Sequence, residues 1–296
     1  MSSTPMQSEA QIYDRGYRRY EGERTGLGGA VRSLVRHSVR HALGLGRAGR
    51  YKIIPVVVVF LAYVPAIAFI GFAAIVPIGT EEFLPSFAEY YGSIVAPIYL
   101  FAGFVAPELL CTDRRTGLLG VYLASPLNRP FYLLGKAISV FLLLLLVTLG
   151  PPLLMLIAFS LQNMGPDGFV EWMRTFGRIL VSSAVIGTLY TAIALGISAT
   201  TDRATVAIAA VLAAIPGAGI ITSILDESTD VSPVVRLANV LSLPQELIFR
   251  VQDEAGNGNW STLDNPTWTL WAAWFFWVGI SLGWVWVRYR RLLVRR

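Results

Sequence analysis

The sequence predicts an all-α polytopic membrane protein with six transmembrane helices, and three observations lead to this fold class. Hydrophobic residues make up 54% of the 296 residues, with a mean hydropathy of +0.57. Charged residues make up only 15%, against about a quarter of a typical soluble chain. The apolar residues also gather in six runs, each close to the length needed to cross the roughly 30 Å hydrocarbon core of a bilayer.

A transmembrane helix needs about 20 consecutive apolar residues. The six expected spans cover residues 53–78, 94–110, 133–161, 179–199, 205–225 and 267–287. They divide the chain into an N-terminal segment over 1–52, a transmembrane domain over 53–287 and a basic tail over 288–296. Two connections stand out within the transmembrane domain, a loop over 111–132 and a long segment over 226–266.

The distribution of lysine and arginine predicts the orientation, because these residues accumulate in cytoplasmic loops. All but four of the 24 fall on one side of the predicted membrane, the exceptions being Arg174, Arg178, Arg236 and Arg250. Both termini are therefore expected in the cytoplasm, with the chain in a bacterial inner (plasma) membrane. Segment 1–52 lacks the apolar core of a cleavable signal and is expected to stay on the mature protein.

Composition argues against several other kinds of chemistry. The single Cys111 cannot form an internal disulfide, and with His37 and His41 alone it cannot complete a four-ligand metal site without distant carboxylates. The net charge of +5 comes from residues that flank apolar spans, so lipid headgroups are the expected counter-charge rather than nucleic acid. We therefore expect no catalytic residue, metal or cofactor on this chain.

Neither glycine-rich phosphate motif is present in its proper context. The sequence GLGRAG over residues 44–49 has G-x-G-x-x-G spacing, but it follows a predicted helix instead of a strand and is interpreted as a hinge. No G-x-x-x-x-G-K-[ST] loop occurs in the sequence. Any dependence on ATP is therefore expected to come from a partner.

The stretch over residues 27–46 predicts an amphipathic helix at the membrane surface. Its apolar residues recur at steps of three and four, while Arg32, Arg36 and Arg40 occupy another face. Apolar burial and attraction to anionic lipid would hold such a helix on the membrane. Docking of a partner is compatible with the same pattern.

The loop after the second span carries a recognisable motif, TDRRTGLLGVYLASPLNRPFYLLGK from Thr112 to Lys136. It resembles the first cytoplasmic loop of ABC-2 type transporter permeases. The matching positions are Asp113, Arg114, Gly117, Leu119, Pro126, Arg129, Leu134, Gly135 and Lys136. Leu118 and Gly120 depart from the family pattern, which has threonine and glutamate there.

The resemblance implies an ABC-2 exporter-like transmembrane domain in which this loop forms a coupling helix. Such a helix docks on a separate ATPase subunit, which binds ATP and Mg²⁺, and a second permease copy or a related chain completes a dimer. The residues implied in coupling are Asp113, Arg114, Arg115, Thr116, Gly117 and Leu119. The alternative interpretation, which does not use the resemblance, is a solvated, positively charged cytoplasmic loop.

Segment 226–266 resembles the family's long outer segment, which holds two short helices that dip back into the membrane. Residues 231–240 and 243–249 are the candidates, and both are too short to span. A folded outer cap is the alternative interpretation.

The predicted function is therefore that of a permease subunit in an ATP-driven exporter. Only Glu108 and Lys136 approach the apolar regions, too few charges for an ion-coupled carrier. An intramembrane enzyme is disfavoured because no histidine lies in a span, but a structural or regulatory membrane protein stays open. Some residues of the fourth span weakly suggest an amphipathic or lipidic cargo, and packing between helices is an equal alternative for them, namely Thr188, Tyr190, Thr191, Ser198 and Thr200.

Overall fold

The computed structural model describes residues 26–46, 49–75, 86–124, 127–228, 233–254, 258, 260 and 262–291. Over these residues the chain forms eleven α-helices and one 3₁₀-helix, without a strand. Pro126, which belongs to the predicted coupling motif, and residues 1–25 lie outside the described residues. The all-α fold class predicted from the sequence is confirmed.

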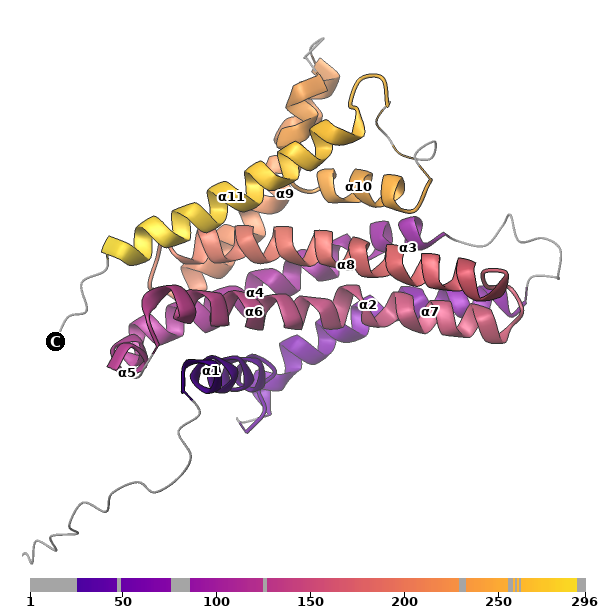
Figure 1. The fold of residues 1–296 in the computed structure, drawn as a ribbon. Coiled ribbons are helices and arrows are strands. Elements are labelled where there is room, and N and C mark those ends of the chain that lie inside the picture. The colour runs from indigo at the N-terminus through magenta and orange to yellow at the C-terminus, as the bar shows by residue number, and fades with distance from the viewer. Residues whose placement is uncertain are drawn as a thin grey trace, which may run out of the picture.

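Among the described residues, six helical segments are long and apolar enough to cross a membrane, in agreement with the predicted number. These segments are α2 (Arg50–Ala73), α4 (Val95–Arg115), α6 (Arg129–Thr148) together with α7 (Gly150–Leu161), α8 (Gly168–Ser198), α9 (Ala204–Ser228) and α11 (Thr267–Arg291). Figure 1 shows α4, α6, α7 and α8 running along one direction, with α1 and α5 toward one end and α3 and α10 part of the way toward the other.

The third predicted span is two helices in the structure. The break falls at Leu149, and two prolines open α7, Pro151 and Pro152. Proline fits the first turn of a helix because its missing N–H has no partner there. A Cβ on Gly150 would collide with the Tyr63 hydroxyl of α2, so glycine lets α2 and α7 approach closely at the break.

The fourth span begins earlier than the sequence predicted, at Gly168 instead of residue 179. Hydropathy hid this extension because it carries Glu171, Arg174 and Arg178. Glu171 and Arg174 form an ion pair one helical turn apart, and the Trp172 and Phe176 rings stack with centroids 5.6 Å apart. At 31 residues and 1.5 Å per residue, α8 extends roughly 46 Å and projects beyond the hydrocarbon core.

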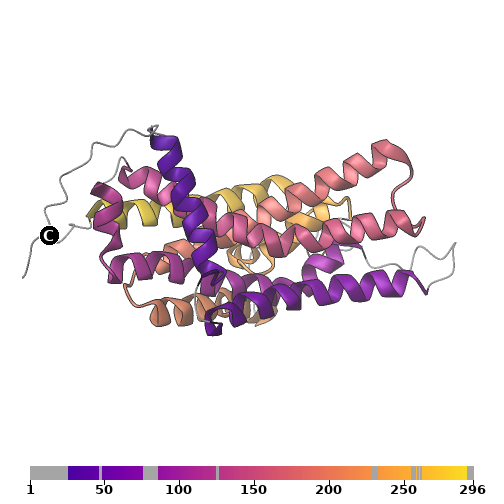
Figure 2. The same ribbon diagram turned by 90° about the horizontal axis from the view of Figure 1, so that it is seen from below.

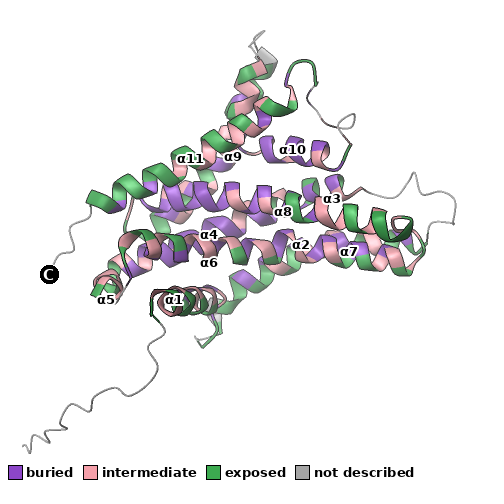
Figure 3. Ribbon diagram, viewed as in Figure 1, coloured by how far each residue is buried: buried purple, intermediate pink, exposed green. Residues whose placement is uncertain are grey.

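Helices α4 and α8 form the centre of the bundle, and α2, α9 and α11 lie at its periphery (Figure 3). In the most apolar stretch of α8, 78% of residues are buried, against 11% in α11. A helix that is apolar yet exposed is expected to face lipid. The exposed apolar sides of the peripheral helices are therefore expected to face lipid or a neighbouring copy.

The first described helix, α1 (Gly26–Ala42), runs across the direction of the other helices (Figure 2). Its apolar side packs on α6, where Leu34 is buried against Gly135. The sequence predicted that this side would lie in the membrane, but in the structure it contacts protein. Arg32, Arg36 and Arg40 lie on the exposed side.

We call the end of the bundle with α1, α5 (Leu118–Ala124) and the last turns of α11 the basic end (Figure 1). The far end holds α3 (Phe87–Ser93), the 3₁₀-helix η2 (Pro233–Ala238) and α10 (Leu243–Val251). A capping box between Ser86 and Glu89 starts α3. Helix α10 packs against α3, α8 and α11, which gives a short helix the shelter from lipid that a re-entrant segment needs.

Candidate functional site

The end of α4 is joined to the beginning of α6 by a buried ion pair. Lys136 Nζ lies 2.7 Å from Asp113 Oδ2, and the Tyr132 hydroxyl donates to the same oxygen at 2.8 Å. All three side chains are almost fully buried. A buried charge requires such partners because it has lost its hydration. The pair therefore fixes α4 and α6 relative to each other.

Arg114 holds the turn between α8 and α9. Its guanidinium donates to the carbonyl oxygens of Ser198 at 2.6 Å and Ala199 at 3.0 Å, and also to that of Thr201. The carbonyls at the end of a helix have no partner within the helix, and their partial negative charge favours a cation. The guanidinium also pairs with Asp202, with 3.3 Å between Nε and Oδ1. Arg114 thus fastens α4 to the C-terminus of α8.

Three tyrosines surround these charges. The Tyr132 ring lies between those of Tyr122 and Tyr289, with centroid distances of 5.8 Å and 6.2 Å. Lys136 Nζ lies 5.7 Å from the centroids of both Tyr122 and Tyr132, within the range of cation–π attraction. Burial, with the Asp113 carboxylate adding to it, raises the pKa of the Tyr122 phenol above its usual 10.0. Tyr122 therefore stays neutral beside Lys136.

Helix α5 projects from this buried cluster with none of its residues fully buried. Gly117 separates it from α4 with a φ of +73°, a left-handed conformation that favours glycine. Leu118 is 38% exposed and Val121 67% exposed. We define the coupling surface as the exposed residues Arg115, Thr116, Gly117, Leu118 and Val121. It belongs to the part of the predicted coupling loop that is open to a partner.

The structure places the predicted site residues in two groups. Asp113, Arg114 and Lys136 turn into the bundle, and Leu119 packs partly against its core. Arg115, Thr116 and Gly117 are exposed. Arg129 donates to the Arg290 carbonyl on α11 at 2.9 Å. Gly135 lies under Leu34, where a Cβ would stand 2.8 Å from a leucine methyl, so glycine lets α1 approach α6.

Sequence reasoning missed four residues of this cluster, namely Tyr122, Tyr132, Asp202 and Tyr289. Tyr132 and Lys136 are four residues apart and so share one helix face, a signal that could have paired them. Asp202 and Tyr289, whose ring centroid lies 5.6 Å from the Arg114 guanidinium carbon, come from distant parts of the chain, and no local pattern links either one to Arg114. The structure alone brings them together.

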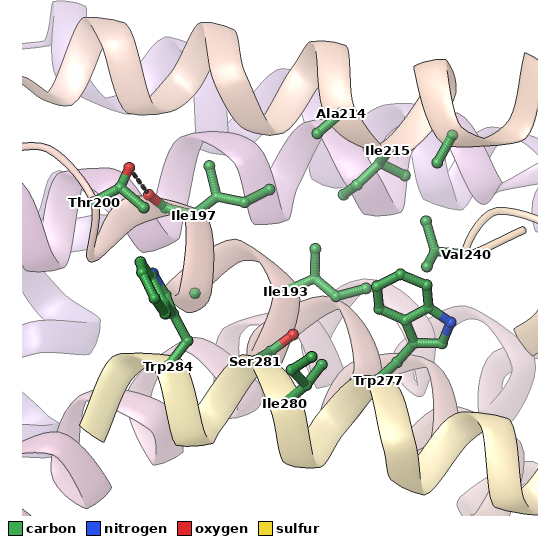
Figure 4. A pocket seen from close by; sticks show the side chains of 12 residues that line it. Ile193, Ile197, Thr200, Ala214, Ile215, Val240, Trp277, Ile280, Ser281 and Trp284 are labelled. Carbon is green, nitrogen blue, oxygen red and sulfur yellow. Dashed lines mark hydrogen bonds between the residues drawn. The ribbon is translucent and has the colours of Figure 1, made fainter. Parts of the chain in front are cut away.

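An apolar cavity of about 480 Å³ lies between α8, α9 and α11 (Figure 4). Its lining comes from Ile193, Gly196, Ile197 and Thr200 of α8 and the turn after it, Ala214, Ile215 and Ala218 of α9, Val240, and Trp277, Ile280, Ser281 and Trp284 of α11. Among the small polar residues that the sequence associated with a path, Thr200 belongs to this lining. Tyr190, Thr191 and Ser198 are instead buried between helices.

These features define a multi-pass helical membrane protein with a polar cluster and a short projecting helix at one end. The family model for ABC-2 family transporter proteins matches residues 74–287, which include α3 to α10 and most of α11. The chain therefore belongs to the ABC-2 transporter family and is a permease component of an ABC transporter. A comparison with curated proteins gave no match.

Proposed function

We propose that the chain is the membrane-spanning subunit of an ATP-driven exporter that works with separate ATPase subunits. One chain would form half of the translocation path, and a second copy or a related chain would form the other half. ATP and Mg²⁺ would bind to the ATPase subunits, since the sequence has no phosphate-binding loop of the Walker type. Membership of the ABC-2 family supports this assignment.

The observation that carries the proposal is the coupling surface at the basic end. Leu118 and Val121 expose apolar side chains beside the cationic Arg115, a combination suited to a partner with an apolar cleft and an acidic rim. All but four of the 24 basic residues lie in the N-terminal segment, the loops and the C-terminal tail on the predicted cytoplasmic side, which favours a cytoplasmic position for this end. The ATPase would therefore meet α5 from the cytoplasm.

The buried cluster explains how movement of α5 would reach the spans. Asp113 and Arg114 lie directly before the coupling surface, and they bind Lys136 of α6 and the carbonyls after α8. A displacement of α5 would thus be carried to α6 and α8 through short polar contacts instead of through lipid-exposed side chains. In this account, Asp113 and Arg114 are positioning residues and do not touch the ATPase.

Membrane lipid is the proposed partner of the basic side of α1. Arg32, Arg36 and Arg40 are exposed on one helix whose opposite side is packed on α6. Arginines at a cytoplasmic membrane surface attract anionic headgroups. The helix would then lie between the bundle and the headgroups of a bacterial inner membrane, with both chain termini in the cytoplasm.

The test is co-purification of the tagged chain with its ATPase from native membranes. Arg115→Glu together with Val121→Asp should abolish recovery of a vanadate-sensitive ATPase, because both changes oppose a partner that accepts an apolar, basic surface. A matched control is Val170→Asp, which changes an exposed valine at the far end. Equal ATPase recovery from both variants would contradict the proposal, and a wild-type chain that purifies alone would favour a regulatory role.

A further inference from the structure

The cavity between α8, α9 and α11 is lined almost entirely by hydrocarbon. Figure 4 shows α9 and α11 on opposite sides of it, with Ile193 and Ile197 of α8 between them. Trp277 and Trp284 lie toward its two ends. The cavity is therefore bounded by α8, α9 and α11, and all three helices belong to the predicted membrane spans.

Polar groups of the lining are largely used within the protein. The Trp277 indole N–H donates to the Leu237 carbonyl at 3.1 Å, and the Thr200 hydroxyl donates to the Ile197 carbonyl at 2.7 Å. The other lining side chains are aliphatic or aromatic, and the Ser281 hydroxyl and the Trp284 indole N–H are their polar groups. A cavity with so few available hydrogen-bonding groups selects an apolar occupant, because a buried polar group without a partner costs free energy.

The size and position of the cavity narrow the choice of occupant. Three turns of helix, about 10 Å wide and about 16 Å long, fill on the order of 1,300 Å³, well above the 480 Å³ of the cavity. A whole helix of a neighbouring protein would therefore not fit inside it. Ile220 and Ile221 of α9 and Phe276 of α11 are exposed. Such apolar surfaces on membrane spans are bathed by acyl chains.

We propose that this cavity is a binding site for one hydrocarbon chain of a membrane lipid. The hydrocarbon chain of the lipid would lie against α8 between Trp277 and Trp284, and the polar headgroup of the lipid would lie outside the apolar lining. Thr200, at one end of the cavity, belongs to the turn whose carbonyls Arg114 binds. The site thus adjoins the contact that fastens α4 to α8.

The test counts dioleoyl phosphatidylcholine molecules bound to the purified chain in detergent micelles by native mass spectrometry. Ala214→Phe with Ala218→Phe fills the cavity, since both alanines line it. The matched control is Ala209→Phe with Ala213→Phe, which has the same spacing on the same helix but uses exposed alanines outside the lining. Ala218→Phe alone provides a milder filled variant if the double variant does not fold.

The wild type and the control are expected to retain one tightly bound lipid, and the filled variants should bind it at least tenfold more weakly. Equal lipid binding by all variants, or no retained lipid on the wild type, would overturn the proposal. A filled variant that changes from dimer to monomer without a change in lipid count would instead assign this face to a contact between copies. The readout needs no ATPase, so its failure leaves the proposed function untouched.

Discussion

Each end of the bundle contains a buried ion pair, but the two pairs connect different parts of the chain. At the basic end, Asp113 of α4 meets Lys136 of α6 at 2.7 Å. At the far end, Glu246 and Arg250 lie one turn apart on α10, at 3.3 Å. The first pair joins two long helices, whereas the second forms within one short helix. The comparison indicates that the basic end is built to keep separate helices in a fixed arrangement.

The largest expected effect comes from breaking the pair at the basic end. Lys136→Met would leave Asp113 buried without its cation and should lower the free energy of unfolding by about 3–5 kcal/mol. Thermal unfolding in detergent, followed by circular dichroism, would measure the loss. Combining Lys136→Met with Asp113→Leu should recover most of it, because two apolar side chains replace the pair. No recovery in the double variant would mean that the charges act separately.

An exposed ion pair provides the control for this result. Arg174→Met removes the cation from the pair with Glu171 on α8, where both side chains are about half exposed. Water and salt screen such a pair, so the expected change is within about 0.5 kcal/mol. If Arg174→Met lowered the free energy of unfolding as much as Lys136→Met, burial would not be the reason for the large effect at Lys136.

At the far end, Glu246→Gln should cost less than the change at Lys136. Arg250 would lose its carboxylate partner but keep its hydrogen bond to the Thr267 hydroxyl, which is 3.2 Å long. An expected loss of about 2 kcal/mol follows from one poorly satisfied buried group. If the same unfolding measurement gave a larger loss than Lys136→Met, the far end would be the more constrained of the two.

Removing the tyrosine hydroxyl at the basic end separates the ion pair from its hydrogen bond. Tyr132→Phe keeps the ring against Tyr122 and Tyr289 but removes the donor to Asp113. Because Lys136 still neutralises the carboxylate, the expected loss of unfolding free energy is about 1 kcal/mol. A loss close to that of Lys136→Met would assign the stabilisation to the hydroxyl instead.

The smallest expected effect concerns Glu254 at the far end, beside Ser86, Glu89 and Arg178. Burial, with the Glu89 carboxylate adding to it, raises the pKa of the Glu254 carboxyl above its usual 4.5. The folded state therefore holds the proton of Glu254 more tightly than the unfolded chain does. The stability of the protein that comes from this protonated carboxyl is complete below pH 4.5 and is lost as the pH rises through the folded-state pKa. Glu254→Gln should accordingly raise the unfolding temperature at pH 7 and make no difference at pH 4. An equal rise in unfolding temperature at both pH values would contradict the raised pKa of Glu254 as the cause.

Hydropathy and charge placement were sufficient to predict the six spans. They failed at the start of α8, because Glu171, Arg174 and Arg178 lower the hydropathy of a segment that is nevertheless helical. They also could not show that the α1 side containing Leu34 packs on α6, because an amphipathic pattern does not distinguish protein from lipid.

The sequence indicated the segment that contains Asp113 and Arg114 but did not indicate that both side chains are buried in the bundle. Asp113 follows the buried Leu109 and Leu110 by four and three residues, so helical periodicity places it on the buried face of α4. That signal was present in the sequence. The partners of Arg114 could not be read there, because its ligands are backbone carbonyls more than eighty residues away. Local patterns do not encode such contacts.

Site-directed cross-linking tests the central claim most directly, namely that α5 is the contact with an ATPase subunit. Val121→Cys places an accessible thiol on the coupling surface, while the native Cys111 is fully buried. Val170→Cys, at the far end, is the control with similar exposure. A thiol-specific photoactivatable cross-linker should join the ATPase to residue 121 and not to residue 170. No adduct at 121, or equal adducts at both positions, would contradict the account.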